Sequence, residues 1–268
     1  MQPFYRVTSA VLGLVFFLTT CSVDDLKDPI IVPLIDQEFH LDLWQTLGES
    51  TLSNLEVRMT TIEDEECLNT RILSTYERTG RVTAITLYDI LDPETCDPGS
   101  APARGEERLT DLEPETYGIK IELRDVVSND GTLHVTEDGY FIEMTESTGF
   151  TWLNKTIYRV PDNLLWGYVA FANAAEEARV ADFVADLRAQ GVPAELTEGY
   201  YGYFTVSNGG NTVKIADAPS ADSAKIIFLD YTGGNALIDQ KIAAFLSETG
   251  NENIELRLLN SRGDEWIN

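Results

Sequence analysis

Hydrophobic and polar residues alternate along the first half of the chain. Leu55, Val57 and Met59 are separated by polar residues, and the same period of two recurs over 119–123 and 140–144. Side chains of a strand point alternately to its two faces, so this spacing predicts strands with one buried face.

Turn residues divide the alternating segments. Asp138-Gly139 separates two of them by two residues, which is a hairpin signal because glycine accepts a positive φ. No helical period is sustained in this region. The pattern therefore predicts an antiparallel β-sandwich over residues 46–163.

After Pro161 the period changes to that of helices. Asn173 is a suitable N-cap, and a first apolar stripe with helical spacing follows it, at Val180, Phe183, Val184 and Leu187. Asn235 precedes a second stripe, at Ile238, Ile242, Phe245 and Leu246. We expect two helices, which end near Gly191 and Gly250.

Strand patterns surround these helices. They lie at 164–171, 194–199, 200–207, 212–216, 226–231 and 254–259. Strand, helix, strands, helix, strand is the order of a ferredoxin-like βαββαβ domain. The whole chain is thus predicted to be α+β, with the β-sandwich followed by a ferredoxin-like domain over residues 164–268.

One face of the predicted second sheet collects aromatic residues. If both helices cover the face that carries Val169, Phe171, Phe204 and Val206, the alternating positions must point the other way. That second face would hold Trp166, Tyr168, Tyr201, Tyr203 and Arg257. Such a face is typical of sugar- and peptide-binding surfaces, but packing against the first domain would also account for it and is the interpretation we favour. Both interpretations stay open.

Part of the same region resembles a known glycan-binding family. Gly167-Tyr168-Val169-Ala170-Phe171, the first helix, and Gly191-Val192-Pro193-Ala194 together are similar to half of a peptidoglycan-binding SPOR domain. The similarity covers about 30 residues, and the later strands are spaced further apart than in that family. It implies a glycan ligand for the second domain.

The N-terminus has the pattern of a secretory signal. Arg6 precedes an apolar run at 10–18 that is too short to span a membrane. Leu18-Thr19-Thr20-Cys21 resembles the lipobox of bacterial lipoproteins, although Thr20 stands where that family has a smaller residue. The resemblance implies removal of residues 1–20 and attachment of lipid to Cys21. A tether over residues 21–45 would follow.

The residues after Cys21 refine the expected location. Ser22 resembles the residue of lipoproteins that reach the outer membrane, and Asp24-Asp25 is similar to the export tag of Bacteroidota surface lipoproteins. The acids are equally compatible with a solvated tether. We expect an outer-membrane protein that faces the periplasm or the cell surface. In that oxidising compartment Cys67 and Cys96 are predicted to form a disulfide.

Composition narrows the function classes. A hydrophobic content of 43% is normal for globular proteins, and a net charge of −26 argues against nucleic-acid partners. The acids suit either calcium or plain solvation, but none has the glycine-turn spacing of a calcium loop. With two histidines and no catalytic pattern, we predict no catalytic residues, metal or cofactor.

The leading hypothesis is a non-enzymatic envelope lipoprotein that binds or organises cell-envelope components, with the membrane as partner through its lipid. The first alternative is a glycan- or peptidoglycan-binding module that uses the aromatic face. A second alternative is a carboxylate-based glycan hydrolase, since such chemistry needs only two acids and the chain holds 45.

Overall fold

A computed structural model describes residues 36–268, except 49–54, 125, 221–222 and 250–252. The described residues belong to one compact unit that spans Ile35–Asn268. The predicted signal sequence and Cys21 lie outside them. Within the described part of the chain, no helix has the length and apolar character of a membrane span.

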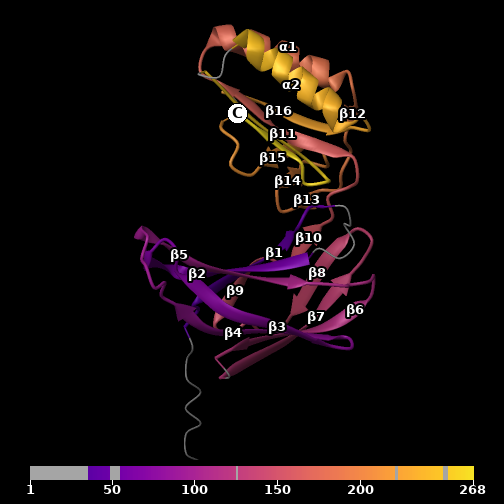
Figure 1. Cartoon of the computed structure of the whole chain (residues 1–268). Coiled ribbons are helices and arrows are strands. Elements are labelled where there is room, and N and C mark those ends of the chain that lie inside the picture. The colour runs from indigo at the N-terminus through magenta and orange to yellow at the C-terminus, as the bar shows by residue number, and fades with distance from the viewer. Residues whose placement is uncertain (1–35, 49–54, 125, 221–222, 250–252) are drawn as a thin grey trace, which may run out of the picture. The chain divides into compact units, whose positions relative to one another are not determined.

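Ten strands form one strongly curved, nearly closed sheet (Figure 1). They follow the spatial order β10-β8-β7-β6-β4-β3-β5-β2-β1-β9. Their bounds are β1 (Phe39–Gln45), β2 (Leu55–Cys67), β3 (Arg71–Thr79), β4 (Val82–Leu91), β5 (Pro98–Leu109), β6 (Thr116–Leu123), β7 (Val127–Val135), β8 (Gly139–Met144), β9 (Phe150–Asn154) and β10 (Thr156–Tyr158).

The two ends of this sheet are consecutive in the chain. β9 pairs with β1, β10 pairs with β8, and only Lys155 separates β9 from β10. The carbonyl oxygen of Lys155 accepts a hydrogen bond from the Ile142 backbone N–H at 2.7 Å. One bent segment therefore supplies both edge strands of the nearly closed sheet.

The inward faces of these strands make one apolar core. Leu41, Leu43, Val57, Ile121 and Tyr140 are fully buried there. The predicted alternation is confirmed for Val57, Ile121 and Tyr140, because these positions belong to the strand faces that the sequence assigns to a core. β1 occupies residues 39–45 of the predicted tether, and its own period of two accounts for the difference.

The C-terminal region contains a five-stranded antiparallel sheet covered by two helices (Figure 1). Its order is β12 (Val192–Pro193), β16 (Ala224–Asp230), β11 (Leu164–Phe171), β17 (Ile254–Asn260) and β18 (Glu265–Ile267). The helices are α1 (Ala174–Arg188) and α2 (Asn235–Thr249), and their predicted apolar stripes pack on Val169 and Phe171. Asn173 caps α1 by accepting from the Ala175 and Glu176 N–H groups, as predicted.

A third sheet covers the opposite face of β11. It consists of β13 (Gly199–Tyr200), β14 (Phe204–Ser207) and β15 (Thr212–Ile215). Phe204 and Val206 pack against Trp166 in this layer rather than against the helices. Their predicted orientation is wrong because they lie on a separate sheet, so the alternation along β14 has no fixed relation to the faces of β11.

The predicted fold class is also wrong. The structure is mostly β, with 54% strand and 13% helix, and its first part is one nearly closed sheet rather than a β-sandwich. The later part is not the predicted ferredoxin-like domain, since a third sheet is inserted between β12 and β16. An alternating pattern indicates only that one face of each strand is buried. A single sheet curled around its own core produces this pattern, and so do two stacked sheets.

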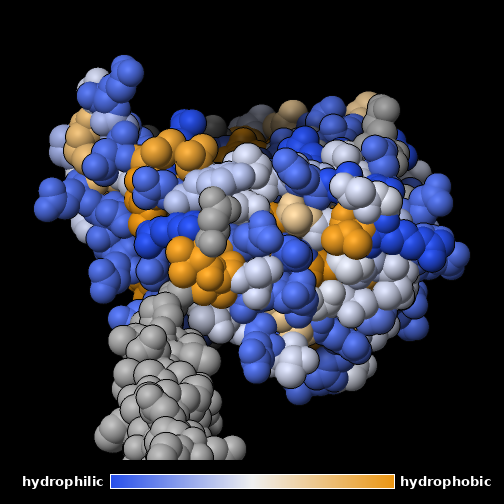
Figure 2. Space-filling model, turned by 90° about the horizontal axis from the view of Figure 1, so that it is seen from below, coloured by the Kyte–Doolittle hydropathy of each residue, from blue (hydrophilic) through white to orange (hydrophobic). Residues whose placement is uncertain are grey.

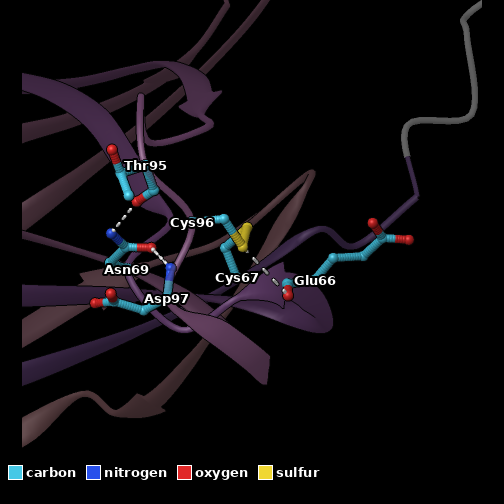
Figure 3. Close-up of a disulfide and its surroundings, with 6 residues drawn as sticks. All are labelled: Glu66, Cys67, Asn69, Thr95, Cys96 and Asp97. Carbon is cyan, nitrogen blue, oxygen red and sulfur yellow. Dashed lines mark hydrogen bonds between the residues drawn. A yellow bond between two sulfur atoms is a disulfide. The ribbon is translucent and has the colours of Figure 1, made fainter.

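The predicted disulfide between Cys67 and Cys96 is present (Figure 3). It links the end of β2 to the segment before β5, with Cα atoms 5.3 Å apart. Asn69 strengthens this link: its side chain donates to the Thr95 carbonyl at 2.9 Å and accepts from the Asp97 N–H at 3.0 Å. The turn from β2 to β3 is thereby fixed to the segment around Cys96.

The face of the molecule drawn in Figure 2 is predominantly hydrophilic. Figure 2 shows hydrophobic residues in small separate groups on the face that it presents. Among the large apolar side chains that remain exposed are Leu68 at 55% and Val126 at 66%. Isolated apolar side chains of this kind are normal on protein surfaces and identify no site by themselves.

Candidate functional site

A small pocket lies beside the centre of the five-stranded sheet. Its volume is about 230 Å³, and β1, β2, β11, β17 and the end of β15 contribute to its wall. The lining residues are Trp44, Arg58, Trp166, Gly167, Tyr168, Tyr203, Ile215, Ala216, Asp217, Arg257 and Leu259. The aromatic pocket, as we call it, combines bulky rings with charged side chains.

The aromatic pocket unites four of the five residues predicted to form a ligand face. Trp166, Tyr168, Tyr203 and Arg257 line it, and Tyr201 does not. Tyr201 is buried, stacks on Phe204 with ring centroids 4.9 Å apart, and donates to the Thr197 carbonyl at 2.9 Å. Tyr201 is therefore a packing residue between two sheets.

Three of the lining rings contact one another. The Trp44 and Tyr203 centroids are 4.6 Å apart, and those of Trp166 and Tyr203 are 5.7 Å apart. The Trp44 indole N–H donates to the Tyr203 hydroxyl at 3.2 Å. These contacts fix the ring planes, so that the apolar part of the wall is preorganised.

Tyr168 presents a neutral phenol at the wall. Its hydroxyl donates to the Glu255 carboxylate at 2.6 Å. Burial, aided by this hydrogen bond to a negative charge, raises the pKa of Tyr168 to about 12. Tyr168 is thus protonated throughout the physiological pH range.

Two arginines and one aspartate supply charge. The Arg58 guanidinium lies 3.8 Å from the centre of the Trp44 ring and donates to the Glu56 carboxylate at 2.7 Å. Arg257 donates to Glu265 at 2.9 Å. Each guanidinium carries five N–H donors, so these pairs leave further donors for a ligand. Asp217 adds the one carboxylate among the lining residues.

The indole N–H of Trp166 is unsatisfied. Trp166 has no exposed surface, and its nitrogen has no hydrogen-bond partner among the described residues. A buried donor without an acceptor costs roughly 1–3 kcal/mol. Because this nitrogen is itself buried, the cost belongs to the packing of the fold, and the N–H is not exposed to a ligand in the aromatic pocket.

Trp44 and Arg58 are the aromatic and basic lining residues that the sequence did not single out. Leu41 and Leu43 of β1 are buried, so the alternation predicts that Trp44 points to the other face of the strand. The sequence does not predict that Trp44 lies close to Tyr203, which is 159 positions away in the chain. Among the described residues, no group of His, Cys, Asp and Glu could hold a metal ion.

Comparison with known proteins adds no relative. No known protein family, curated protein or solved structure matches this chain. The functional conclusion therefore rests on the aromatic pocket itself and on the residue patterns of the sequence.

Proposed function

We propose that this chain is a non-enzymatic, lipid-anchored envelope protein that binds a glycan in the aromatic pocket. The observation that carries the glycan proposal is that three aromatic rings (Trp44, Trp166 and Tyr203) and two guanidinium groups (Arg58 and Arg257) line one pocket. A sugar ring has apolar C–H faces and a polar hydroxyl edge, and this lining offers a partner to each.

The size of the aromatic pocket limits the ligand. Its volume of about 230 Å³ is below the range of roughly 300–1,000 Å³ that is usual for drug-sized ligands. It is suited to one sugar unit, with the rest of a longer glycan outside. Hydrolysis has less support, because a glycosidase needs two carboxylates and the lining includes only Asp217.

Glycan binding is tested by titrating the processed protein with peptidoglycan fragments and neutral oligosaccharides while tryptophan fluorescence is recorded. Two of the four tryptophans line the pocket, so binding should change the emission. Trp44→Leu keeps an apolar side chain but removes the ring. It should weaken binding about tenfold, which corresponds to 1.4 kcal/mol.

Trp266→Leu is the matched control. Trp266 lies in β18, does not line the aromatic pocket, and donates to Asp239 at 2.7 Å. This variant should bind like the wild type. The glycan proposal fails if the wild type binds none of these saccharides, or if both tryptophan variants bind equally well.

The anchor is a separate proposal that rests on Leu18-Thr19-Thr20-Cys21. Protein expressed in a Gram-negative bacterium should partition into the detergent phase of a Triton X-114 extract. Cys21→Ser should move it to the aqueous phase, whereas Ser22→Ala should leave it in detergent. Mass spectrometry that finds an intact leader or an unmodified Cys21 would refute the anchor.

A further inference from the structure

A second depression, larger than the aromatic pocket, lies on the ten-stranded sheet. It is an open groove of about 870 Å³ along β2, the β2–β3 turn, the start of β3, and β5. β3 and β5 pair at a single position, where Arg71 lies beside Arg104. The sheet is least continuous here, which accounts for the opening. We name this depression the arginine groove.

Positive charge is concentrated in the arginine groove. Arg58, Arg71 and Arg104 line it, and Glu106 is the one acid among the lining residues. Arg58 is paired with Glu56, but Arg71 and Arg104 form no ion pair within the described part of the chain. In a chain with 45 acids and 19 bases, two adjacent arginines without carboxylate partners leave donors for an external anion.

The wall beside Arg71 is rigid and carries an unused hydroxyl. Thr70 lines the groove with 3% of its surface exposed, and its hydroxyl has no hydrogen-bond partner among the described residues. The neighbouring Asn69 and Cys67 are held to the segment around Cys96 by the contacts drawn in Figure 3. This side of the groove is therefore preorganised.

The two depressions share one residue. Arg58 lines both the aromatic pocket and the arginine groove. Arg58 is therefore within reach of a ligand in either depression, and Arg104 and Arg71 line the same groove as Arg58. Guanidinium groups bind carboxylates through two parallel hydrogen bonds.

We propose that the arginine groove binds the carboxylates of an acidic oligosaccharide whose neighbouring unit occupies the aromatic pocket. This inference rests on the proposed glycan function and adds the chemical class of the glycan. The net charge of −26 repels anions at long range. At about 0.15 M salt that repulsion is screened beyond roughly 8 Å, so contacts with Arg71 and Arg104 decide the binding.

The test compares galacturonate hexamers, which carry a carboxylate on each unit, with neutral maltohexaose by calorimetry at about 0.15 M salt. The wild type should bind the acidic hexamer about tenfold more tightly. Arg71→Gln with Arg104→Gln should abolish this preference and leave the affinity for the neutral hexamer unchanged. Arg71→Lys with Arg104→Lys should retain part of the preference for the acidic hexamer, because lysine keeps the positive charge but lacks the paired N–H donors of a guanidinium group.

Arg81→Gln with Arg262→Gln is the matched control, since it changes the net charge equally and neither residue lines the groove. It should keep the preference for the acidic hexamer. A preference that survives Arg71→Gln with Arg104→Gln, while the variant unfolds like the wild type, overturns the groove proposal.

The same panel separates the two sites. Binding of the acidic hexamer that survives Trp44→Leu but is lost in the glutamine variant would overturn the aromatic pocket and keep the groove. Suppose instead that Trp44→Leu no longer binds the neutral hexamer, while the glutamine variant still prefers the acidic hexamer. This result would keep the aromatic pocket and overturn the groove.

Discussion

Gly167 is the residue at which the backbone of the site allows least change. It has a φ of +151°, and a Cβ atom there would lie 2.0 Å from the Arg257 carbonyl oxygen of β17. Any side chain would force β11 and β17 apart in the middle of the five-stranded sheet. The absence of a side chain thus lets these two strands, which carry Trp166, Tyr168 and Arg257, pair closely beside the aromatic pocket.

Gly167→Ala should therefore destabilise the protein by about 3 kcal/mol or more, measured by urea unfolding. Gly234→Ala is the matched control, because a Cβ atom at Gly234 would meet nothing within 4 Å. Its effect should stay within about 0.5 kcal/mol. Equal stabilities of the two variants would contradict the steric argument.

Asp264 confers a pH dependence at the start of α2. Its carboxylate accepts from the Asn235 side chain at 2.7 Å and from the Asn260 side chain at 2.9 Å. These hydrogen bonds lower the pKa of Asp264 below its ordinary value of 3.8. Because the folded pKa is the lower one, the stabilisation is complete above the unfolded pKa and is lost as the pH falls through the folded pKa.

In the Asp264→Asn variant the side chain at position 264 cannot ionise. The variant should therefore not lose the stability that the wild type loses when Asp264 is protonated. The difference in unfolding free energy between wild type and variant should be constant from about pH 7 to about pH 5 and shrink below about pH 4. Urea unfolding over this range measures it. A constant difference down to about pH 3 would show that Asp264 is not stabilised by these amides.

At the scale of elements, local pattern predicts strands and helices better than it predicts their partners. Asn173 and the stripe from Val180 to Leu187 identify α1, since capping and helical spacing are properties of neighbouring residues. The insertion of β14 into a third sheet depends instead on contacts such as Phe204 with Trp166, which local spacing does not encode. For the same reason, the local pattern did not predict that the ten-stranded sheet is nearly closed.

The closing segment should be sensitive to loss of volume. Ile157 in β10 is fully buried in the core of the ten-stranded sheet, whereas Leu153 in β9 is 55% exposed. Ile157→Ala should cost about 3 kcal/mol of stability and Leu153→Ala less than about 0.5 kcal/mol. Similar losses in urea unfolding would mean that β10 does not seal this core.

The disulfide should act mainly on the unfolded chain. Cys67 and Cys96 are 29 positions apart, and closing a loop of that length stabilises a fold by about 3–4 kcal/mol. Cys67→Ala with Cys96→Ala should lose that amount in non-reducing urea unfolding. A reducing agent should produce the same loss in the wild type and no further loss in the variant.

At the scale of the whole molecule, the candidate site joins residues that are far apart in sequence. Trp166, Tyr168 and Arg257 were predictable because alternation along β11 and β17 assigns them to the face opposite the helices, whereas Tyr203 precedes β14 of the separate third sheet. Trp44 and Arg58 come from the ten-stranded sheet, whose contact with Tyr203 only the complete structure reveals. The sequence could thus indicate an aromatic surface, but it could not indicate that residues of the ten-stranded sheet turn this surface into a small pocket.

The net charge of −26 acts on the molecule as a whole. Self-repulsion of excess charge disfavours the compact state, and salt reduces it by shortening the screening length from about 30 Å at 0.01 M to about 3 Å at 1 M. Salt also weakens the exposed ion pairs, for example Arg81 with Glu115, but each such pair contributes only about 0–1 kcal/mol. The repulsion should therefore dominate the response to salt.

Raising sodium chloride from about 0.01 M to about 0.5 M should increase the melting temperature by several degrees in scanning calorimetry. Potassium chloride should give the same increase, because screening depends on ionic strength and not on the identity of the cation. A decrease would show that ion pairs outweigh the excess acid. A much larger rise with magnesium or calcium chloride at equal ionic strength would instead indicate that carboxylates bind divalent cations, the interpretation of the acidic surface that the sequence left open.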